Sequence, residues 1–243
     1  TKILENKGIV PEMAAGLSLG EYSALYAAGV FDEQQVISLV AFRGQSMAEA
    51  VVDRACKMAA VINLDREKVE ACCAQAHEEF KDEACNVVEP TNYNCPGQIV
   101  ISGDVAPVDR AIELLTEAGA RRCIPLVVSG PFHTSLMKPA GDKLRERFKE
   151  ESFGDMKIPV VFNSLGRFKT EEESIPALLE KQVQHSIYIE DSIRYMAEQG
   201  VDTIVEIGPG TALSKFVKKT CPEITCYSVE KVADVDALLE KLA

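Results

Sequence analysis

Ser18 lies in the stretch Gly16-Leu-Ser-Leu-Gly20, between a short apolar run and a segment with apolar residues at helical spacing. A G-x-S-x-G sequence between a strand and a helix is typical of a nucleophile elbow, a sharp turn that exposes a serine hydroxyl. The glycines permit the tight turn and leave room for a substrate. Free N–H groups at the start of the following helix could stabilise an oxyanion. Ser18 could also serve only as the N-cap of that helix, so the motif alone leaves both roles open.

A serine hydroxyl becomes an effective nucleophile when a base accepts its proton, and the chain offers three histidines. His77 lies in a charged helical segment and is predicted to be a surface residue, whereas His185 lies beside an apolar run that favours packing. His133 follows a predicted strand, in a loop with Gly130 and Pro131. Loops after strands often carry catalytic groups, which makes His133 the candidate base. An ordinary loop histidine remains the alternative on position alone.

The sequence predicts alternating strands and helices on both sides of a central segment, and these elements must position Ser18 and His133. Apolar runs such as residues 13–15, 158–164 and 223–230 predict strands, and helical patterns follow or separate them. This alternation predicts a largely parallel sheet that is covered by helices on both faces.

The central segment has a different pattern. Residues 57–128 predict strand, helix, strand, strand, helix and strand in that order. This is the split β-α-β order of ferredoxin-like units, so the segment could form a subdomain inserted into the larger domain.

Composition narrows the possible partners and the compartment. The net charge is −12 over 243 residues, which argues against nucleic acid and anionic membranes as partners. No apolar run approaches the roughly 20 residues of a membrane span, and the first residues do not resemble a secretory signal. The eight cysteines do not have the spacing of a metal site, and a core of this size needs no disulfides, so we expect free thiols in a reducing cytoplasm and no bound metal.

Five segments that occur in this order carry a family resemblance over essentially the whole chain. They are GLSLGEYSALYAAGVF, AFRGQSM, NYNCPGQIVISG, GPFHTSLMKPA and VEIGPGTALS. Together they resemble the malonyl-CoA:acyl-carrier-protein transacylases of bacterial fatty-acid synthesis. The resemblance implies an α/β-hydrolase-like core over residues 1–55 and 128–243, with a ferredoxin-like subdomain over residues 56–127.

The resemblance also implies roles for individual residues. Ser18 matches the acylated serine and His133 its general base, a dyad without a third acid. Gln182 matches the position whose main-chain carbonyl orients the histidine, and the Leu19 amide matches an oxyanion donor. Arg43 matches the arginine that binds the malonyl carboxylate, for which a planar fork of donors is well suited.

Further substrate contacts are implied by the same resemblance. Phe132 precedes the histidine, and in related polyketide acyltransferases phenylalanine there accompanies malonyl rather than methylmalonyl. Asn92 and Asn94 match a loop near the mouth of the active site, although such residues beside a Cys-Pro-Gly sequence could simply form a turn. The Gly208-Pro-Gly210 turn could bind phosphate or only permit close packing of strand and helix.

The sequence departs from the family pattern in two places. Leu17 precedes the nucleophile where the family usually has histidine. The family also begins with a strand and a glutamine-containing loop that supplies a second oxyanion donor, and the sequence here starts after that loop. We therefore expect the sequence to be partial, and the loss of one such donor typically lowers the rate by about 10²–10³.

The resemblance implies a monomeric enzyme that transfers malonyl from CoA to acyl carrier protein without a cofactor. Because the carrier is acidic, we expect it to dock on a local basic patch, for which Arg121, Arg122, Lys218 and Lys219 are candidates. A serine esterase or thioesterase, an acyltransferase domain of a polyketide synthase, and a non-enzymatic binding module or inactive fragment remain the alternatives. A third catalytic acid and hydrolysis without a thiol acceptor would indicate the esterase.

Overall fold

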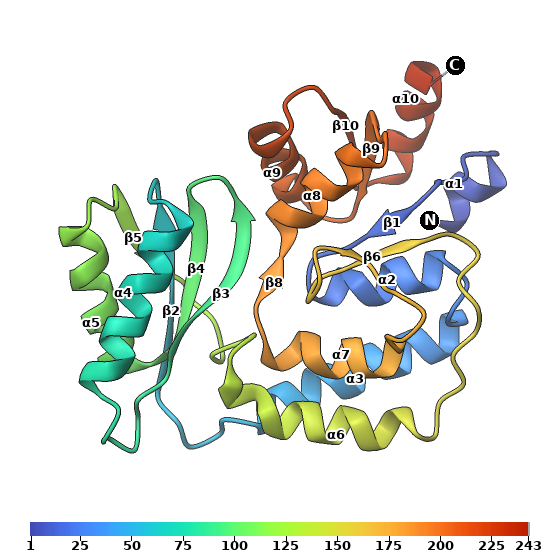
Figure 1. The fold of residues 1–243 in the computed structure, drawn as a ribbon. Coiled ribbons are helices and arrows are strands. Elements are labelled where there is room, and N and C mark those ends of the chain that lie inside the picture. The colour runs from blue at the N-terminus through green and yellow to red at the C-terminus, as the bar shows by residue number, and fades with distance from the viewer. Residues whose placement is uncertain (243) are drawn as a thin grey trace.

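Two lobes make up the molecule, and the chain passes from the larger lobe into the smaller one and back (Figure 1). The computed structural model describes residues 1–242. The smaller lobe corresponds to the predicted ferredoxin-like unit, and the larger lobe carries both chain ends.

The smaller lobe follows the predicted order of strands and helices. Its elements are β2 (Cys56–Ile62), α4 (Arg66–Glu79), β3 (Val88–Cys95), β4 (Gln98–Asp104), α5 (Val105–Glu117) and β5 (Arg122–Pro125). The strands pair in the order β5-β2-β4-β3, all antiparallel, and both helices cover one face of the sheet (Figure 1). The predicted ferredoxin-like arrangement is therefore confirmed.

Alternating side chains give this sheet two apolar faces. Ala59, Val61 and Ile101 point toward the two helices and are buried among residues such as Leu115. On the opposite face, Met58, Ala60 and Val100 form a second cluster that Phe132 of the larger lobe joins. The back of the small sheet thus forms part of the surroundings of the predicted site, because residues i and i+2 of a strand share one face.

The larger lobe contains most of the helices. Its elements are α1 (Lys2–Asn6), β1 (Ala14–Ala15), α2 (Leu19–Ala27), α3 (Glu33–Glu49), the 3-10 turn η1 (Ser135–Met137), α6 (Lys138–Phe148), β6 (Val160–Phe162), β7 (Arg167–Phe168), α7 (Ile175–Gln184), β8 (Ile187–Tyr188), α8 (Ile189–Glu198), β9 (Thr203–Ile207), α9 (Ala212–Thr220), β10 (Thr225–Val229) and α10 (Val232–Leu242).

Within the described residues, the strands of the larger lobe form two short sheets and not one continuous sheet. β1 pairs with β6 in parallel and β7 joins β6 antiparallel, while β9 and β10 form a separate parallel pair. β8 pairs instead with β3 of the smaller lobe. The predicted α/β class is confirmed, and two of the three strand pairs within the larger lobe are parallel, although these strands form two sheets and not one. The strand ends agree with the sequence, since Gly16 follows β1 and Pro159 precedes β6.

Four helices of the larger lobe pack side by side and determine where the site residues lie. α2, α3, α6 and α7 surround a core that includes Tyr22, Leu25, Leu39, Leu144 and Leu179 (Figure 1). The hydroxyl-bearing turn precedes α2, the arginine of the AFRGQSM segment lies on α3, and the predicted orienting glutamine lies near the end of α7. Burial of this common core therefore brings three distant segments together.

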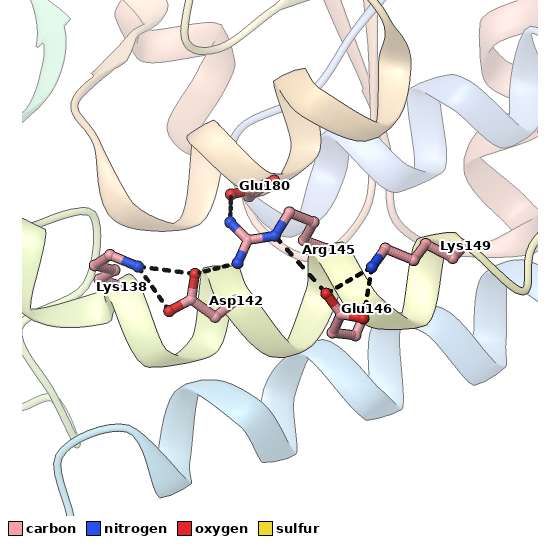
Figure 2. Close-up of polar contacts among 6 residues, drawn as sticks. All are labelled: Lys138, Asp142, Arg145, Glu146, Lys149 and Glu180. Atoms are coloured by element: carbon pink, nitrogen blue, oxygen red, sulfur yellow. Dashed lines mark hydrogen bonds and ion pairs between the residues drawn. The ribbon is translucent and has the colours of Figure 1, made fainter.

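The contact between α6 and α7 is close and is bridged by charges. A Cβ at Gly141 would lie 2.8 Å from the Gln184 side-chain nitrogen, so a larger residue would require the end of the Gln184 side chain to move. Figure 2 shows Arg145 of α6 bonded both to Asp142 on its own helix and across to Glu180 of α7, the latter at 2.9 Å. Exposed pairs of this kind contribute only about 0–1 kcal/mol each, so the apolar core supplies most of the stability.

Two further features concern the whole chain. Over residues 1–242 we find no helix with both the length and the apolar character that crossing a membrane requires. All eight cysteines are free thiols in the structure.

Candidate active site

Ser18 has a backbone conformation that non-glycine residues rarely adopt. Its φ and ψ are 54° and −104°, and it is the last residue of the three-residue turn between β1 and α2. A Cβ at Gly16 would lie 2.1 Å from the main-chain carbon of Gly20, so only glycine permits this turn. Such strain costs on the order of 1–3 kcal/mol and persists only where the surroundings enforce it. The Ser18 side chain makes no capping hydrogen bond, which argues against a role as an ordinary N-cap.

The Ser18 hydroxyl and the His133 imidazole meet within hydrogen-bonding distance. Ser18 Oγ lies 2.8 Å from His133 Nε2, and His133 Nδ1 lies 2.7 Å from the main-chain oxygen of Gln182. A carbonyl oxygen can only accept, so Nδ1 carries the proton and Nε2 presents a lone pair to the serine hydroxyl. This is the tautomer that a general base requires.

His133 is buried, and its environment keeps it neutral. The pKa of His133 is lowered to about 4, mainly by burial; the Gln182 carbonyl opposes this shift, and the nearby Arg43 charge adds to it. The imidazole is therefore free to accept a proton at neutral pH. His133 itself has a φ of 63°, a second strained residue in the same site.

Arg43 reaches from α3 into the same site. Its Nη2 donates to Ser18 Oγ at 2.9 Å and to the side-chain oxygen of Gln182 at 3.0 Å. Arg43 is only 5% exposed, and its guanidinium lies 5.8 Å from the centre of the Tyr22 ring. Burial lowers the pKa of Arg43, but arginine starts so high that it stays charged. A buried cation beside a nucleophile is suited to binding an anionic substrate group.

A cavity of about 340 Å³ connects these side chains. Ser18, Arg43 and Phe132 line it together with Met47 of α3. Its lining thus combines the Ser18 hydroxyl and the Arg43 cation with apolar side chains, the composition expected of a small-molecule site.

The Leu19 amide lies where the sequence predicts an oxyanion donor. Leu19 is the first residue of α2, and within residues 1–242 its N–H has no hydrogen-bond acceptor. Unpaired N–H groups at a helix start attract negative charge. The preceding Leu17 packs in an apolar cluster with residues of α8 and α9.

Asn92 and Asn94 lie elsewhere. Both belong to β3, which runs through Cys95, so the prediction that they lie in a loop is wrong. Pairing with β4, interrupted by irregularities between Pro90 and Asn92 and between Tyr93 and Cys95, keeps this segment extended. Neither residue lines the cavity that contains Ser18. A role in substrate binding stays a prediction for both.

The other two histidines are exposed. The surface position predicted for His77 is confirmed. The packing role predicted for His185 is wrong, because His185 is the exposed residue that ends α7.

The Gly-Pro-Gly turn before α9 is not open to an anion. Glu206 accepts hydrogen bonds from the Leu213 and Ser214 N–H groups at 3.0 and 2.9 Å, so a carboxylate of the chain already occupies this helix start. Close packing of strand and helix does not explain the two glycines either, because a Cβ at Gly208 or Gly210 would meet nothing within 4 Å; both glycines instead have positive φ, 141° and 82°. In the described part of the chain we also find no group of His, Cys, Asp and Glu that could hold a metal ion.

Three polar groups in the site were not found from the sequence. The Gln182 side chain donates to the Ser18 carbonyl at 2.7 Å, in addition to accepting from Arg43. Asn163, at the end of β6, accepts from the Ser18 N–H at 2.6 Å, and its own N–H donates to Glu21 at 2.6 Å. The S-x-x-E spacing of Ser18 and Glu21 is the one signal that could have drawn attention to the glutamate.

A strained serine after a strand, a neutral histidine and a helix start beside both form the arrangement that α/β enzymes with a serine nucleophile use. A model of the acyl transferase domain family matches residues 1–237. The chain belongs to this acyl transferase family, and it is an acyltransferase.

Individual relatives agree with this assignment. A malonyl CoA-acyl carrier protein transacylase of Bacillus subtilis is 40% identical over 238 residues, which cover 98% of this chain and 74% of the relative. The crystal structure of MCAT from Streptococcus pneumoniae is 48% identical, with a TM-score of 0.92 over 99% of this chain and 76% of the other. A type II PKS acyl-carrier protein complexed with its malonyl-transacylase includes a chain that is 37% identical, with a TM-score of 0.91 over 99% of this chain and 76% of that one.

Proposed function

We propose that this chain moves a malonyl group from CoA to the phosphopantetheine thiol of an acyl carrier protein through an ester on Ser18. The observation that carries the proposal is the position of Arg43, whose guanidinium donates to the nucleophile oxygen inside one cavity. That cation gives the free carboxylate of malonyl a partner close to the reacting carbon.

In the first half-reaction, Ser18 Oγ attacks the thioester carbonyl while its proton passes to His133 Nε2. The carbonyl oxygen takes the negative charge, and the Leu19 N–H donates to it. The carbon–sulfur bond then breaks, and the imidazolium returns its proton to the CoA sulfur. The product is a malonyl ester on Ser18 and free CoA.

In the second half-reaction, the carrier thiol gives its proton to His133 Nε2 and its sulfur attacks the ester carbonyl. The carbon–oxygen bond breaks, and the imidazolium returns the proton to Ser18 Oγ. Each step moves only a proton and an acyl group, so the proposed reaction needs no redox cofactor.

The Arg43 fork has donors to spare for the malonyl carboxylate. Both hydrogens of Nη2 are directed to Ser18 and Gln182, whereas Nη1 makes no hydrogen bond within the described residues. Nε also has no partner there, but it is buried. Arg43→Ala should lower kcat/KM for malonyl-CoA by roughly 10–100-fold, the worth of a charge-assisted hydrogen bond, and should spare acetyl-CoA. Unchanged preference between the two substrates would contradict the assigned role of Arg43.

Hydrolysis is the competing outcome for a serine ester. The second nitrogen of His133 faces a main-chain carbonyl and not a carboxylate, unlike the triads of esterases. The distinguishing experiment supplies [14C]malonyl-CoA with and without carrier protein and follows the label. We expect the label to move to the carrier faster than it appears as free malonate; a chain that only releases malonate would be a thioesterase. The same assay with fatty-acid and polyketide carriers identifies the physiological acceptor.

Docking of the acidic carrier should use basic groups near the lobe junction. Lys218 and Lys219 lie in the last turn of α9, and a Cβ added at Gly97, in the turn between β3 and β4, would lie 3.9 Å from Lys219 Nζ. The Arg121 N–H donates to the carbonyl of Ile62, the last residue of β2, and the N–H of the next residue, Asn63, donates to the Gly97 carbonyl at 2.7 Å. Transfer to the carrier should slow as salt rises, and charge-driven docking is wrong if it does not. A docking role for Arg122 and a monomeric state stay predictions. A cytoplasmic location, which the free thiols favour, also stays a prediction.

A further inference from the structure

The carboxamide of Asn163 spans the turn that carries Ser18. Asn163 Oδ1 accepts from the Ser18 N–H, and Asn163 Nδ2 donates to the Gly16 carbonyl, both at 2.6 Å. Asn163 is 1% exposed and directly follows β6, which pairs with β1 just before the turn. The Asn163 side chain therefore fixes the main chain on both sides of Leu17, directly before the strained Ser18.

Asn163 is in turn held from two sides. Its N–H donates to Glu21 Oε2 at 2.6 Å, and its carbonyl accepts from the Tyr188 N–H at 2.8 Å. Glu21 is fully buried in the first turn of α2, so it connects the helix that follows Ser18 to the strand that lies beside it. In an S-x-x-E capping box the glutamate would bond to the Ser18 N–H. Here Asn163 takes that N–H, and Glu21 bonds to Asn163.

We propose that Glu21 and Asn163 form a positioning pair that keeps Ser18 in the strained conformation from which it attacks. The inference rests on the proposed function in taking Ser18 as the nucleophile. Neither residue lines the cavity, so neither is expected to contact the substrate. Without the pair, the backbone at Ser18 can relax toward negative φ, which moves Oγ away from His133 and turns the Leu19 N–H away from the developing oxyanion.

Substitutions separate positioning from general stability. Asn163→Ala removes both bonds to the turn. Glu21→Ala leaves the Asn163 N–H without its acceptor, whereas Glu21→Gln keeps an acceptor of nearly the same shape. Ser164→Ala is the matched control, because Ser164 is the next residue, is also buried, and has a hydroxyl with no hydrogen-bond partner in residues 1–242.

Two reagents report on Ser18 by intact mass. Malonyl-CoA gives the limiting acylation rate and its half-saturating concentration. Phenylmethanesulfonyl fluoride has no carboxylate for Arg43 to bind, so it reports on the reactivity of Ser18 alone. In this reaction the Ser18 oxygen bonds to sulfur, fluoride leaves, and His133 takes the proton. Because small misplacements of a reacting atom cost roughly 10²-fold, we expect losses of about 10–100-fold with both reagents for Asn163→Ala. We expect about tenfold for Glu21→Ala, and rates within about threefold of the unaltered chain for Glu21→Gln and Ser164→Ala.

Several outcomes would contradict the proposed positioning role of Glu21 and Asn163. Asn163 does not position the nucleophile if Asn163→Ala reacts at the rate of the unaltered chain. The same conclusion follows if only its half-saturating concentration of malonyl-CoA rises while the limiting rate is unchanged. If Asn163→Ala does not fold, equal rates in Glu21→Ala and Glu21→Gln would reject the proposal. If the sulfonyl fluoride labels the unaltered chain but malonyl-CoA does not, the proposed function is contradicted. The sulfonylation rates of the variants would then still show whether Glu21 and Asn163 position Ser18. A chain that neither reagent labels contradicts both.

Discussion

His133 Nδ1 lies 2.7 Å from the main-chain oxygen of Gln182, so the base is oriented by a carbonyl and not by a carboxylate. A carbonyl fixes the tautomer as well as an acid would, but it brings no negative charge to stabilise the imidazolium. The low pKa of His133 results from burial and from the Arg43 charge, which the bond to the Gln182 carbonyl offsets only in part.

The first prediction concerns the pH dependence of acylation. The pKa of His133 is lowered to about 4, so the neutral base should persist well below the usual value of 6.5. The rate of CoA release from malonyl-CoA should therefore change less than about twofold between pH 7.5 and 5.5 and should fall only nearer pH 4. An inflection near pH 6.5 would mean that the imidazole is solvated and not held as the structure has it.

The second prediction separates the two roles of Gln182. Any residue at this position still provides the carbonyl that orients His133, but Gln182→Ala removes the side-chain bonds to Arg43 and to the Ser18 carbonyl. We expect kcat/KM for malonyl-CoA to fall about tenfold, the worth of one or two hydrogen bonds, with a smaller effect on acetyl-CoA. Equal losses for the two substrates would indicate that the side chain does not act through Arg43.

The third prediction concerns the strain at Ser18. Ser18→Gly and Ser18→Ala both lose the bonds to His133 and Arg43, but only glycine tolerates the positive φ. The glycine variant should exceed the alanine variant in free energy of unfolding by about 1 kcal/mol, after the entropic cost of glycine is subtracted. Urea denaturation measures the difference, and an alanine variant of equal or greater stability would show that the turn is unstrained.

The fourth prediction concerns the stability of the fold against pH. Burial raises the pKa of Glu21 from 4.5 to about 8, although the Asn163 N–H, Gln182 and Arg43 favour the charged form. A raised folded-state pKa stabilises the protein fully below 4.5, and this contribution is lost as pH rises toward 8. The melting temperature of the unaltered chain should therefore fall more between pH 5.5 and 8.5 than that of Glu21→Gln. Parallel curves would place Glu21 in a more polar environment.

The sequence was sufficient for the parts of the site that have a local signature. The G-x-S-x-G pattern identified Ser18, and the loop with glycine and proline pointed to His133. Arg43 gained its role only through the family resemblance, because a single arginine on a helix is usually solvated. Its burial depends on the packing of α2, α3 and α7, which no local pattern encodes.

The missed residues are those whose roles depend on contacts between distant segments. Asn163 bonds to Ser18 across 145 positions of the chain, and β6 is too short to mark its own end in the sequence. The Asn92 and Asn94 segment contains proline and asparagine, which favour turns, yet pairing with β4 overrides that preference. Tertiary pairing also explains why β8 joins the small sheet and not the larger lobe.

The most direct test of the central claim is the intact mass of the chain after brief mixing with malonyl-CoA, compared with Ser18→Ala and His133→Ala. The account predicts one malonyl group on the unaltered chain, none on Ser18→Ala, and acylation slowed by about 10²–10⁴-fold in His133→Ala. Addition of holo carrier protein should then remove the group. A malonyl group that still forms on Ser18→Ala, or that the carrier thiol cannot remove from the unaltered chain, would contradict acyl transfer through Ser18.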